Sequence, residues 1–481
     1  ALNFSKPIML VIQAPLEKYT LKDRLLIQMQ YDASTNKYPM SFPLPMLLLN
    51  IKQDGDELVD LILECKDKNK AGKFESVDNL LNKINTSWDT YSEVIVNMGE
   101  YPADADRYEY FEYFLDNIKV PIFVMGTYPT INRERVLSFN SSFAESNISI
   151  LETDFNITDV YIPDEYLESY PMVGGKKRAV MKITWGCPQH CKMCPVPALY
   201  NGKYKYCGVD GSVARVRDLY NRGVRFITFT DDNISSADKR FVKFMEKVKK
   251  ENFKGLKLHS QEGFEVTAFS NEDFCRLLVE TKWVTVKLGV ENIKEDFLKK
   301  IGKYFFDFNS IDTAIKNIKK YNIKGVRFFF LIGLDETEED VLENLKYFSK
   351  QHVELRTNII RKYKNTELYD MNYTQKMTPA TMRKLKSMAY AISWLSPYKV
   401  DMFDKNALDK FITENGYTTT TKNDKLIIKG RTKFGFQTNR FKTALKCMYE
   451  SKYNTNDSIV TISDGGVEIT NKIIGGFDLW V

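Results

Sequence analysis

The sequence predicts an α/β protein with two series of alternating strands and helices, followed by a small α+β module. Three observations predict this class. Short apolar runs rich in Val and Ile alternate with helical patterns up to about residue 155, the same alternation restarts at Lys177, and the pattern changes after Pro397. A chain of 481 residues is too long for one hydrophobic core. We therefore expect three domains, over residues 1–170, 171–397 and 398–481.

The first series predicts a parallel sheet with helices on both faces, which is a doubly wound, Rossmann-like domain. Its strand candidates are Ile8–Gln13, Glu93–Met98, Val120–Met125 and Ile148–Glu152. Its helical patterns cover Met46–Lys66, Asp106–Asn117 and Asn132–Ser146. Three prolines within Pro39–Pro45 exclude regular structure there and predict a loop at one edge of the sheet.

The second series predicts a partial (β/α)6 barrel, whose chemistry belongs at the carboxyl ends of its strands. Its strand candidates are Arg178–Thr184, Val224–Thr230, Gly255–Ser260, Trp283–Val290, Gly325–Ile332 and Glu354–Ile360. The helical patterns between them are Ser212–Asn221, Ala237–Lys250, Asn271–Thr281, Ile311–Tyr321 and Glu338–Ser349.

The last eighty or so residues predict a small α+β accessory module. Helices are expected near Asn406–Asn415 and over Phe441–Ser451, and strands over Lys425–Lys429, Ser458–Ser463 and Val467–Thr470. The basic residues between Lys422 and Lys446 would suit an anionic substrate, although an amphipathic, solvated surface is the more common explanation.

Composition is that of a globular protein, with 43% hydrophobic and 27% charged residues. No run of 18 apolar residues occurs, so we expect no transmembrane helix. The first residues lack the features of a secretory signal, and the cysteines are few, which together favour the cytoplasm. A net charge of +6 neither requires nor excludes a nucleic-acid partner.

A cluster of three cysteines directly follows the first strand of the second series. Cys187, Cys191 and Cys194 have the spacing C-x₃-C-x₂-C. A four-iron cluster takes four thiolates, so a local set of three leaves one iron open for a substrate or cofactor. A zinc site completed by His190 or Cys207 is the alternative. The other cysteines, Cys65, Cys207, Cys275 and Cys447, are expected to be small buried hydrophobes.

The cysteine spacing, its place after the first strand and the lead-in Thr184-Trp185-Gly186 resemble the radical S-adenosylmethionine (SAM) superfamily. The resemblance covers residues 1–395. It implies that Cys187, Cys191 and Cys194 hold a [4Fe-4S] cluster whose open iron chelates SAM. One electron would then split the sulfonium to methionine and a 5′-deoxyadenosyl radical, with the protein supplying binding and orientation.

The chain also resembles other motifs of this family, although its residues differ from the usual ones at some positions. The sequence Thr230-Asp231-Asp232-Asn233 resembles a variant in which Asp232 and Asn233 would receive the SAM ammonium; helix capping is the alternative for both. Glu291, after the fourth strand, resembles a carboxylate that accepts from the SAM ribose, and a solvated first-turn Glu is its alternative.

Two further residues are assigned to the adenine end of SAM by the same resemblance. Gly333 would permit close approach of the backbone, unless it simply makes the turn. Met193 replaces a usual aromatic residue and would make a similar apolar contact. Arg361–Tyr369 resembles a family motif after the sixth strand in which two prolines and a glycine are replaced here.

An N-terminal doubly wound domain before such a core resembles the cobalamin-binding subgroup of the family. The chain has only His190, His259 and His352, so residues 1–165 hold no histidine that could ligate cobalt. Either cobalamin binds without a lower histidine ligand, or the domain serves packing or substrate recognition.

The sequence therefore predicts a radical SAM enzyme that abstracts hydrogen from a small-molecule or peptide substrate. It would take electrons from an external flavodoxin- or ferredoxin-type donor. With cobalamin the outcome would be methyl transfer, and without it a radical rearrangement or another modification of a peptide or nucleic acid. The alternative of another class is a non-catalytic iron–sulfur or zinc scaffold. No catalytic side chain and no particular substrate is identified.

Overall fold

The computed structural model describes most of residues 75–414 and several shorter segments outside them. The described residues are 25–28, 53, 56–60, 75–98, 108–142, 148–151, 164, 167, 172, 174–235, 237–414, 418–422, 425–429, 459–463 and 466–470. The predicted strand Ile8–Gln13, the loop Pro39–Pro45 and the helix Phe441–Ser451 lie outside these residues. The chain divides into two compact units, residues 1–286 with 362–371 and residues 287–361 with 372–481.

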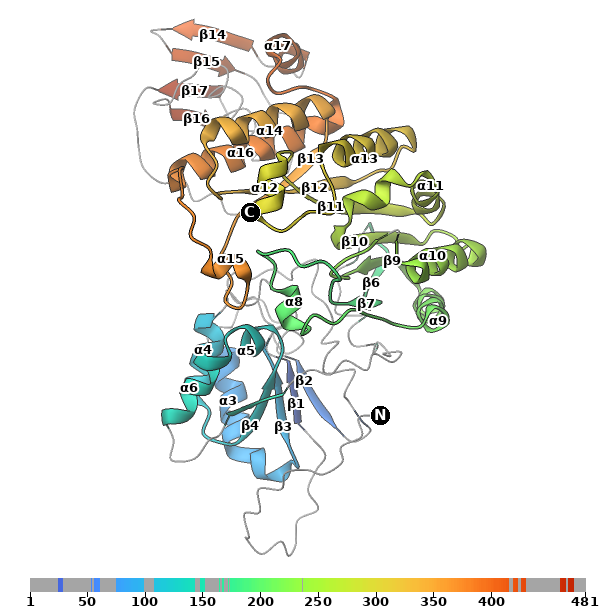
Figure 1. Cartoon of the computed structure of the whole chain (residues 1–481), viewed down its shortest axis with the longest axis vertical. Helices are drawn as coiled ribbons and strands as arrows, with labels where there is room; N and C mark the ends of the chain where they lie inside the picture. The colour runs from blue at the N-terminus through green and yellow to red at the C-terminus, as the bar shows by residue number, and fades with distance from the viewer. Residues whose placement is uncertain are drawn as a thin grey trace, which may run out of the picture. The chain divides into compact units, whose positions relative to one another are not determined.

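The N-terminal sheet has five strands in the order β2-β1-β3-β4-β5, and every pair is parallel (Figure 1). The strands are β1 (Leu25–Gln28), β2 (Glu57–Asp60), β3 (Val94–Asn97), β4 (Ile122–Met125) and β5 (Ile148–Ile150). Helices α3 (Glu75–Ser87), α4 (Tyr108–Asn117), α5 (Thr127–Ile131) and α6 (Arg133–Ser138) accompany it, with short 3₁₀ turns at Trp88–Thr90 and Phe139–Ser142. The predicted doubly wound sheet is confirmed, and its strand order reverses between β1 and β3.

The helix predicted over Met46–Lys66 is wrong in its middle, because Glu57–Asp60 forms strand β2. Leu25 pairs with Glu57 and Gln28 with Asp60 in a parallel ladder. The backbone of β1 provides hydrogen-bond partners for Glu57–Asp60, and the spacing of apolar residues within this segment does not show them. Pairing with a strand distant in the chain therefore overrides the helical pattern. Strand β1 and helix α3 were not predicted.

The second sheet has six strands in the order β13-β12-β11-β10-β9-β6, as expected for a partial barrel. They are β6 (Lys177–Met181), β9 (Val224–Phe229), β10 (Lys257–Phe264), β11 (Trp283–Glu291), β12 (Val326–Ile332) and β13 (Glu354–Ile359). The helices between them are α8 (Val196–Leu199), α9 (Val209–Asn221), α10 (Lys239–Glu251), α11 (Glu272–Glu280), α12 (Glu295–Lys300), α13 (Phe308–Lys320) and α14 (Glu338–Gln351), with a 3₁₀ turn at Val266–Ser270.

Aromatic packing holds helices α10 and α11 against strands β9 and β10. Phe229, Phe241 and Phe264 are fully buried, and the rings of Phe229 and Phe264 each lie 5.2 Å from Trp283. Burying each such ring stabilises the fold by about 1.5–3 kcal/mol. These rings form a buried aromatic core between α10 and the strands β9, β10 and β11.

Local signals fix where the helices begin and end. Helix α10 begins at the Asp238 cap, whose carboxylate accepts from the Arg240 N–H, and ends at Asn252 in the left-handed conformation. Helix α14 begins at a capping box between Thr337 and Asp340. These caps satisfy backbone groups that a helix end leaves without intrahelical partners.

After β13 come α15 (Glu367–Asp370), the long α16 (Pro379–Leu395), a 3₁₀ turn at Ser396–Tyr398 and α17 (Lys405–Glu414). The C-terminal sheet is antiparallel, in the order β14-β15-β17-β16. Its strands are β14 (Thr418–Lys422), β15 (Lys425–Lys429), β16 (Ile459–Ser463) and β17 (Gly466–Thr470). The α+β module is confirmed, with β14 as a strand that was not predicted.

None of the helices in the described part of the chain combines the length and apolarity needed to cross a lipid bilayer.

Candidate functional site

The three cysteines lie on one loop at the carboxyl end of β6. The loop leaves the short strand β7 (Thr184–Trp185) and returns through β8 (Lys205–Tyr206), which pairs with β7. Cys187, Cys191 and Cys194 are half-buried thiols that form no disulfide. The Cys194 N–H donates to the Cys191 carbonyl at 3.0 Å, which folds the second half of the motif into a tight turn.

The donor set fits an iron–sulfur cluster. Three soft thiol donors on one loop are the ligand type that iron–sulfur clusters take, each sulfur binding a different iron. Within the described residues, no group of three His, Cys, Asp or Glu side chains, these cysteines included, is arranged to hold a single metal ion, which requires all donors to meet at one atom. His190, the candidate fourth zinc ligand, is exposed, and Cys207 is buried. Cys207 and Cys275 are buried as expected, while Cys65 and Cys447 lie outside the described residues.

Asp231 anchors the chain just before the loop. One of its carboxylate oxygens accepts from the backbone N–H groups of Ile183, at 3.1 Å, and Thr184, at 2.6 Å, and from the Thr184 hydroxyl. Burial raises the pKa of Asp231 to about 6, against the lowering effect of these hydrogen bonds. This residue, two positions after the end of β9, ties the entry of the cysteine loop to the neighbouring strand.

Asp232 holds the next residue of the same entry segment. Its Oδ2 accepts from the Gly186 N–H at 3.0 Å and lies 2.8 Å from the Lys182 ammonium. Both charged side chains are almost fully buried, at 5% and 3% exposure. Lys182 also lies over the rings of Trp185 and Tyr200, at 4.8 and 5.4 Å from their centroids. The carboxylate predicted to receive an ammonium is therefore already paired with one from this chain.

Gly186 is required at its position for two reasons. Its φ is +79°, in the left-handed region that favours glycine. A Cβ added there would lie 2.0 Å from the Lys203 carbonyl oxygen. The backbone therefore passes too close to leave room for any side chain immediately before Cys187.

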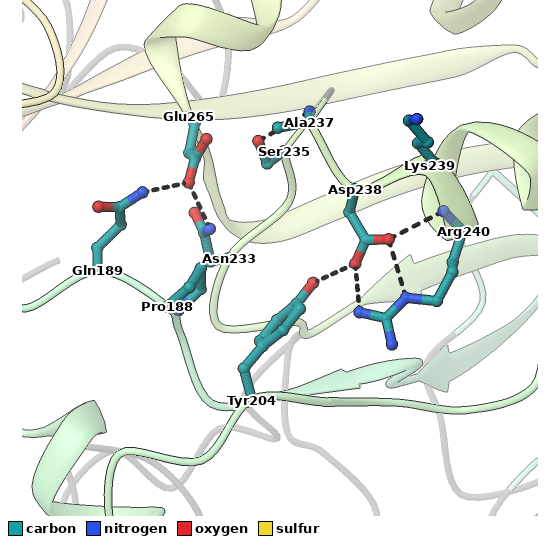
Figure 2. Close-up of a pocket in the computed structure, with 10 residues that line it drawn as sticks. All are labelled: Pro188, Gln189, Tyr204, Asn233, Ser235, Ala237, Asp238, Lys239, Arg240 and Glu265. Carbon is teal, nitrogen blue, oxygen red and sulfur yellow. Dashed lines mark hydrogen bonds and ion pairs between the residues drawn. The ribbon is translucent and has the colours of Figure 1, made fainter.

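A pocket of about 380 Å³ opens beside the cysteine loop (Figure 2). Its lining comprises Pro188, Gln189, Tyr204, Asn233, Ser235, Ala237, Asp238, Lys239, Arg240 and Glu265. Glu265 directly follows β10, and its Oε1 accepts from the Asn233 amide at 2.7 Å and from the Gln189 amide at 3.0 Å. This carboxylate thus connects the cysteine loop to the ends of two strands.

The opposite wall of the pocket is held by Asp238. Its carboxylate accepts from the Tyr204 hydroxyl at 2.8 Å and from the Arg240 guanidinium at 3.0 Å (Figure 2). These hydrogen bonds lower the pKa of Asp238 in spite of its burial. The pocket therefore carries charged groups of both signs, which suits a ligand that is itself zwitterionic.

A segment from beyond β13 supports the cysteine loop. The Leu368 N–H donates to the Lys192 carbonyl at 2.9 Å, between the second and third cysteines. Asn365, where the resembled motif has glycine, takes φ +60° and donates its amide to the Ile131 carbonyl at 2.8 Å. Asn tolerates the left-handed region, so the turn survives the replacement.

The structure shows the burial or the contacts of three more residues that were predicted to bind SAM, Met193, Glu291 and Gly333. Met193 is half-buried on the cysteine loop. In the second unit, Glu291 is buried and its Oε1 lies 2.7 Å from the Lys303 ammonium. Gly333 has φ +104°, and a Cβ there would lie 3.1 Å from Gln375 Nε2. The roles assigned to these three residues stay predictions.

Lys182 and Glu265 are the functional candidates that the sequence prediction missed. The third strand was expected to end at Ser260, but β10 continues to Phe264, so the carboxylate at its end was overlooked. Lys182 follows β6 directly, where a lysine is usually solvated. In the structure its side chain is only 5% exposed and pairs with Asp232, fifty positions later in the chain.

Comparison with known proteins agrees with the loop chemistry. Residues 181–348 match the family model described as "Radical SAM superfamily". An uncharacterized methyltransferase of Pyrococcus horikoshii, PH0819, is 26% identical over 247 residues, or 48% of this chain and 52% of the relative. The ribosomal protein uS12 methylthiotransferase RimO of Campylobacter jejuni is 24% identical over 227 residues, or 44% and 51%. This chain thus spans about half the length of these curated relatives.

Among solved structures, the chain resembles the radical S-adenosylmethionine methyltransferase TsrM of Kitasatospora setae, described with cobalamin and a [4Fe-4S] cluster bound. The TM-score is 0.51 at 13% identity, over 72% of this chain and 77% of that one. At this identity the likeness establishes the fold alone.

Proposed function

We propose that this chain is a radical SAM enzyme in which Cys187, Cys191 and Cys194 hold a [4Fe-4S] cluster to which SAM binds. The match of residues 181–348 to the radical SAM family model supports this proposal. When bound, the cluster supplies the electron that splits the SAM sulfonium into methionine and a 5′-deoxyadenosyl radical. The observation that carries this proposal is the arrangement of three half-buried thiols on a loop beside a charged pocket. The side chains around that loop would bind SAM and orient it.

The pocket residues divide between binding SAM and holding the loop. Asn233 and Glu265 line the pocket, and an amide and a carboxylate oxygen suit the ammonium of the methionine end. Asp232 was predicted to share that role, yet it is paired with Lys182 and accepts from Gly186. We therefore assign Asp232 to holding the loop, and Asn233 with Glu265 to the ammonium. Glu291 would accept from the ribose, and Met193 and Gly333 would lie near adenine.

Cobalamin-dependent methyl transfer is the finer form of the proposal. When bound, cobalamin would supply a transferable methyl group on cobalt. The support is the five-stranded parallel sheet, whose order reverses between β1 and β3, where such sheets bind ligands at their carboxyl ends. Helix α5, which follows β4 at that edge, contacts α8, which follows Cys194. A cofactor at this edge would therefore lie near the cysteine loop. We also propose that the enzyme acts on a small-molecule or peptide substrate, takes electrons from an external flavodoxin- or ferredoxin-type donor and works in the cytoplasm.

The first experiment tests SAM cleavage. Anaerobically reconstituted protein should carry about four irons per chain and form 5′-deoxyadenosine from SAM with dithionite. Cys187→Ala, Cys191→Ala and Cys194→Ala should each abolish this product. Cys275→Ala, which changes a buried cysteine outside the loop, is the matched control and should retain it. Wild-type turnover in any of the three loop variants would refute the assignment.

A second measurement separates the two forms of the proposal. S-adenosylhomocysteine that appears only when hydroxocobalamin and a reductant are added would support methyl transfer, because the reduced cobalt would accept the methyl group of SAM. 5′-Deoxyadenosine formed without any dependence on cobalamin would instead favour a radical rearrangement or another cobalamin-free modification.

A further inference from the structure

Glu291, the last residue of β11, has a backbone conformation that needs support. Its φ is +63°, which is uncommon for any residue with a side chain. Such conformations persist only where surrounding contacts impose them, and they concentrate at functional sites. The adjoining turn is held by Asn292, whose N–H donates to the Val290 carbonyl at 2.8 Å and whose amide donates to Glu336 at 2.8 Å.

A buried lysine supplies the main side-chain contact of Glu291. The Lys303 ammonium donates to Glu291 Oε1 and to the Gly289 carbonyl, both at 2.7 Å. Each of the two charged side chains is only 9% exposed. Burying both charges carries a desolvation penalty, which the close ion pair and the additional carbonyl acceptor offset. Lys303 therefore binds two points of the same strand end.

Gly289 leaves the space in which this ion pair forms. A Cβ added at Gly289 would lie 2.8 Å from Lys303 Nζ and 3.0 Å from Glu291 Oε1. The first separation is too short for real contacts, so even alanine would displace the ammonium. The sequence Gly289-Val290-Glu291 thus has a physical explanation, because the glycine admits the partner of the glutamate.

We propose that Lys303 is a positioning residue that orients Glu291 toward the ribose hydroxyls of SAM, and that Gly289 leaves the space that the Lys303 ammonium occupies. This inference rests on the ribose contact assigned to Glu291 in the proposed function. Lys303 engages Oε1, and no hydrogen bond to Oε2 from another described residue is found. A carboxylate with one oxygen fixed can present the other as an acceptor to a diol.

The test compares the affinities of two ligands. SAM carries the ribose and L-methionine lacks it, so loss of the Glu291 contact must weaken SAM alone. Calorimetric titration of the anaerobically reconstituted enzyme should show SAM binding weakened about tenfold or more in Glu291→Gln. Lys303→Met and Gly289→Ala should show a similar loss, with methionine affinity unchanged in all three. The double variant Glu291→Gln/Lys303→Met should bind SAM no more weakly than Glu291→Gln, since the residues act as one unit.

Two control variants separate positioning from general damage. Lys300→Met removes a lysine from the same segment, and Gly208→Ala adds a methyl group where nothing lies within 4 Å. Both should bind SAM as the wild type does. Iron content and melting temperature establish that each variant is folded and loaded. If Lys303→Met does not fold, Gly289→Ala and the charge-neutral double variant carry the same test.

Three results would overturn the inference. Wild-type SAM affinity in Lys303→Met, with Glu291→Gln weakened, would remove Lys303 from the site and leave the proposed function intact. An equal loss of methionine and SAM affinity in Lys303→Met would reveal a merely structural role. Unchanged SAM affinity in Glu291→Gln would remove the ribose assignment and the inference together, whereas failure to bind a cluster at all would refute the proposed function.

Discussion

The Lys182 ammonium lies 2.8 Å from Asp232 Oδ2, and both side chains are buried directly before the cysteine loop. The same oxygen accepts from the Gly186 N–H, so one carboxylate neutralises a buried charge and fixes the residue that precedes Cys187. The pair joins the end of β6 to the end of β9. The geometry of the cysteine loop therefore depends on a contact between neighbouring strands as well as on its own sequence.

Breaking this pair from one side should be more costly than removing both charges. Lys182→Met or Asp232→Asn leaves an uncompensated buried charge and should lower the free energy of unfolding by about 3–5 kcal/mol. The double variant should lose clearly less than the sum of the two. Urea unfolding of the anaerobic protein measures these values in a double-mutant cycle.

The exposed pair Arg217–Glu251 serves as the matched control, because its side chains are 47% and 33% exposed. Its removal should change stability by no more than about 1 kcal/mol. Additive losses from Lys182→Met and Asp232→Asn would contradict the coupling.

Gly186→Ala should prevent normal closure of the cysteine loop. The added Cβ would lie 2.0 Å from the Lys203 carbonyl oxygen, and φ is already +79°. Because the backbone around residue 186 must move to relieve this clash, the cysteine that follows it should be displaced. We therefore expect most of the iron bound per chain to be lost, as measured after anaerobic reconstitution. Gly208→Ala adds the same atom in open space and should retain full iron content. Full iron incorporation by Gly186→Ala would show that the loop does not need this close approach.

Stability should depend on pH through Glu336. Burial raises its pKa from 4.5 to about 7, against hydrogen bonds from Gly333 and Asn292 that lower it. Because the folded-state pKa lies above the unfolded value, the contribution is complete below about pH 4.5 and is lost as the pH rises through about 7. The stability of wild type relative to Glu336→Gln should therefore fall by about 2–3 kcal/mol between pH 5 and pH 8.

Urea unfolding of wild type and Glu336→Gln at the two pH values tests this. Glu339→Gln removes an exposed carboxylate from the same helix start and controls for general charge effects. A wild-type advantage that grows with pH would contradict the expected sign.

Most strands of the second sheet were predictable because they contain short apolar runs with many buried side chains, as in Val224–Phe229 and Trp283–Glu291. Strands β9, β11 and β13 begin at the predicted residues, and their ends differ by a single position. The first sheet was less predictable. Glu57–Asp60 is a strand because it pairs with β1, and a window of local sequence carries no information about that partner.

The candidate site likewise contains residues that could be predicted from local sequence and residues that could not. The three cysteines are close in sequence, so their spacing alone indicated a common loop. Lys182 and Glu265 were missed because their roles depend on contacts with Asp232 and Asn233, residues distant in the chain. Burial and pairing of a charged residue are tertiary properties. For that reason the residues that orient the loop could not be read from the motif that it carries.

The iron left without a cysteine is proposed to bind SAM directly, and the radical chemistry depends on this bond. Electron–nuclear double resonance of the reduced cluster with SAM carrying ¹⁵N in its amino group tests it most directly. We expect a strong ¹⁵N hyperfine coupling with labelled SAM, which a ¹⁴N coupling replaces when SAM is unlabelled and which disappears when SAM is omitted. A spectrum without nitrogen coupling at saturating SAM would contradict direct binding.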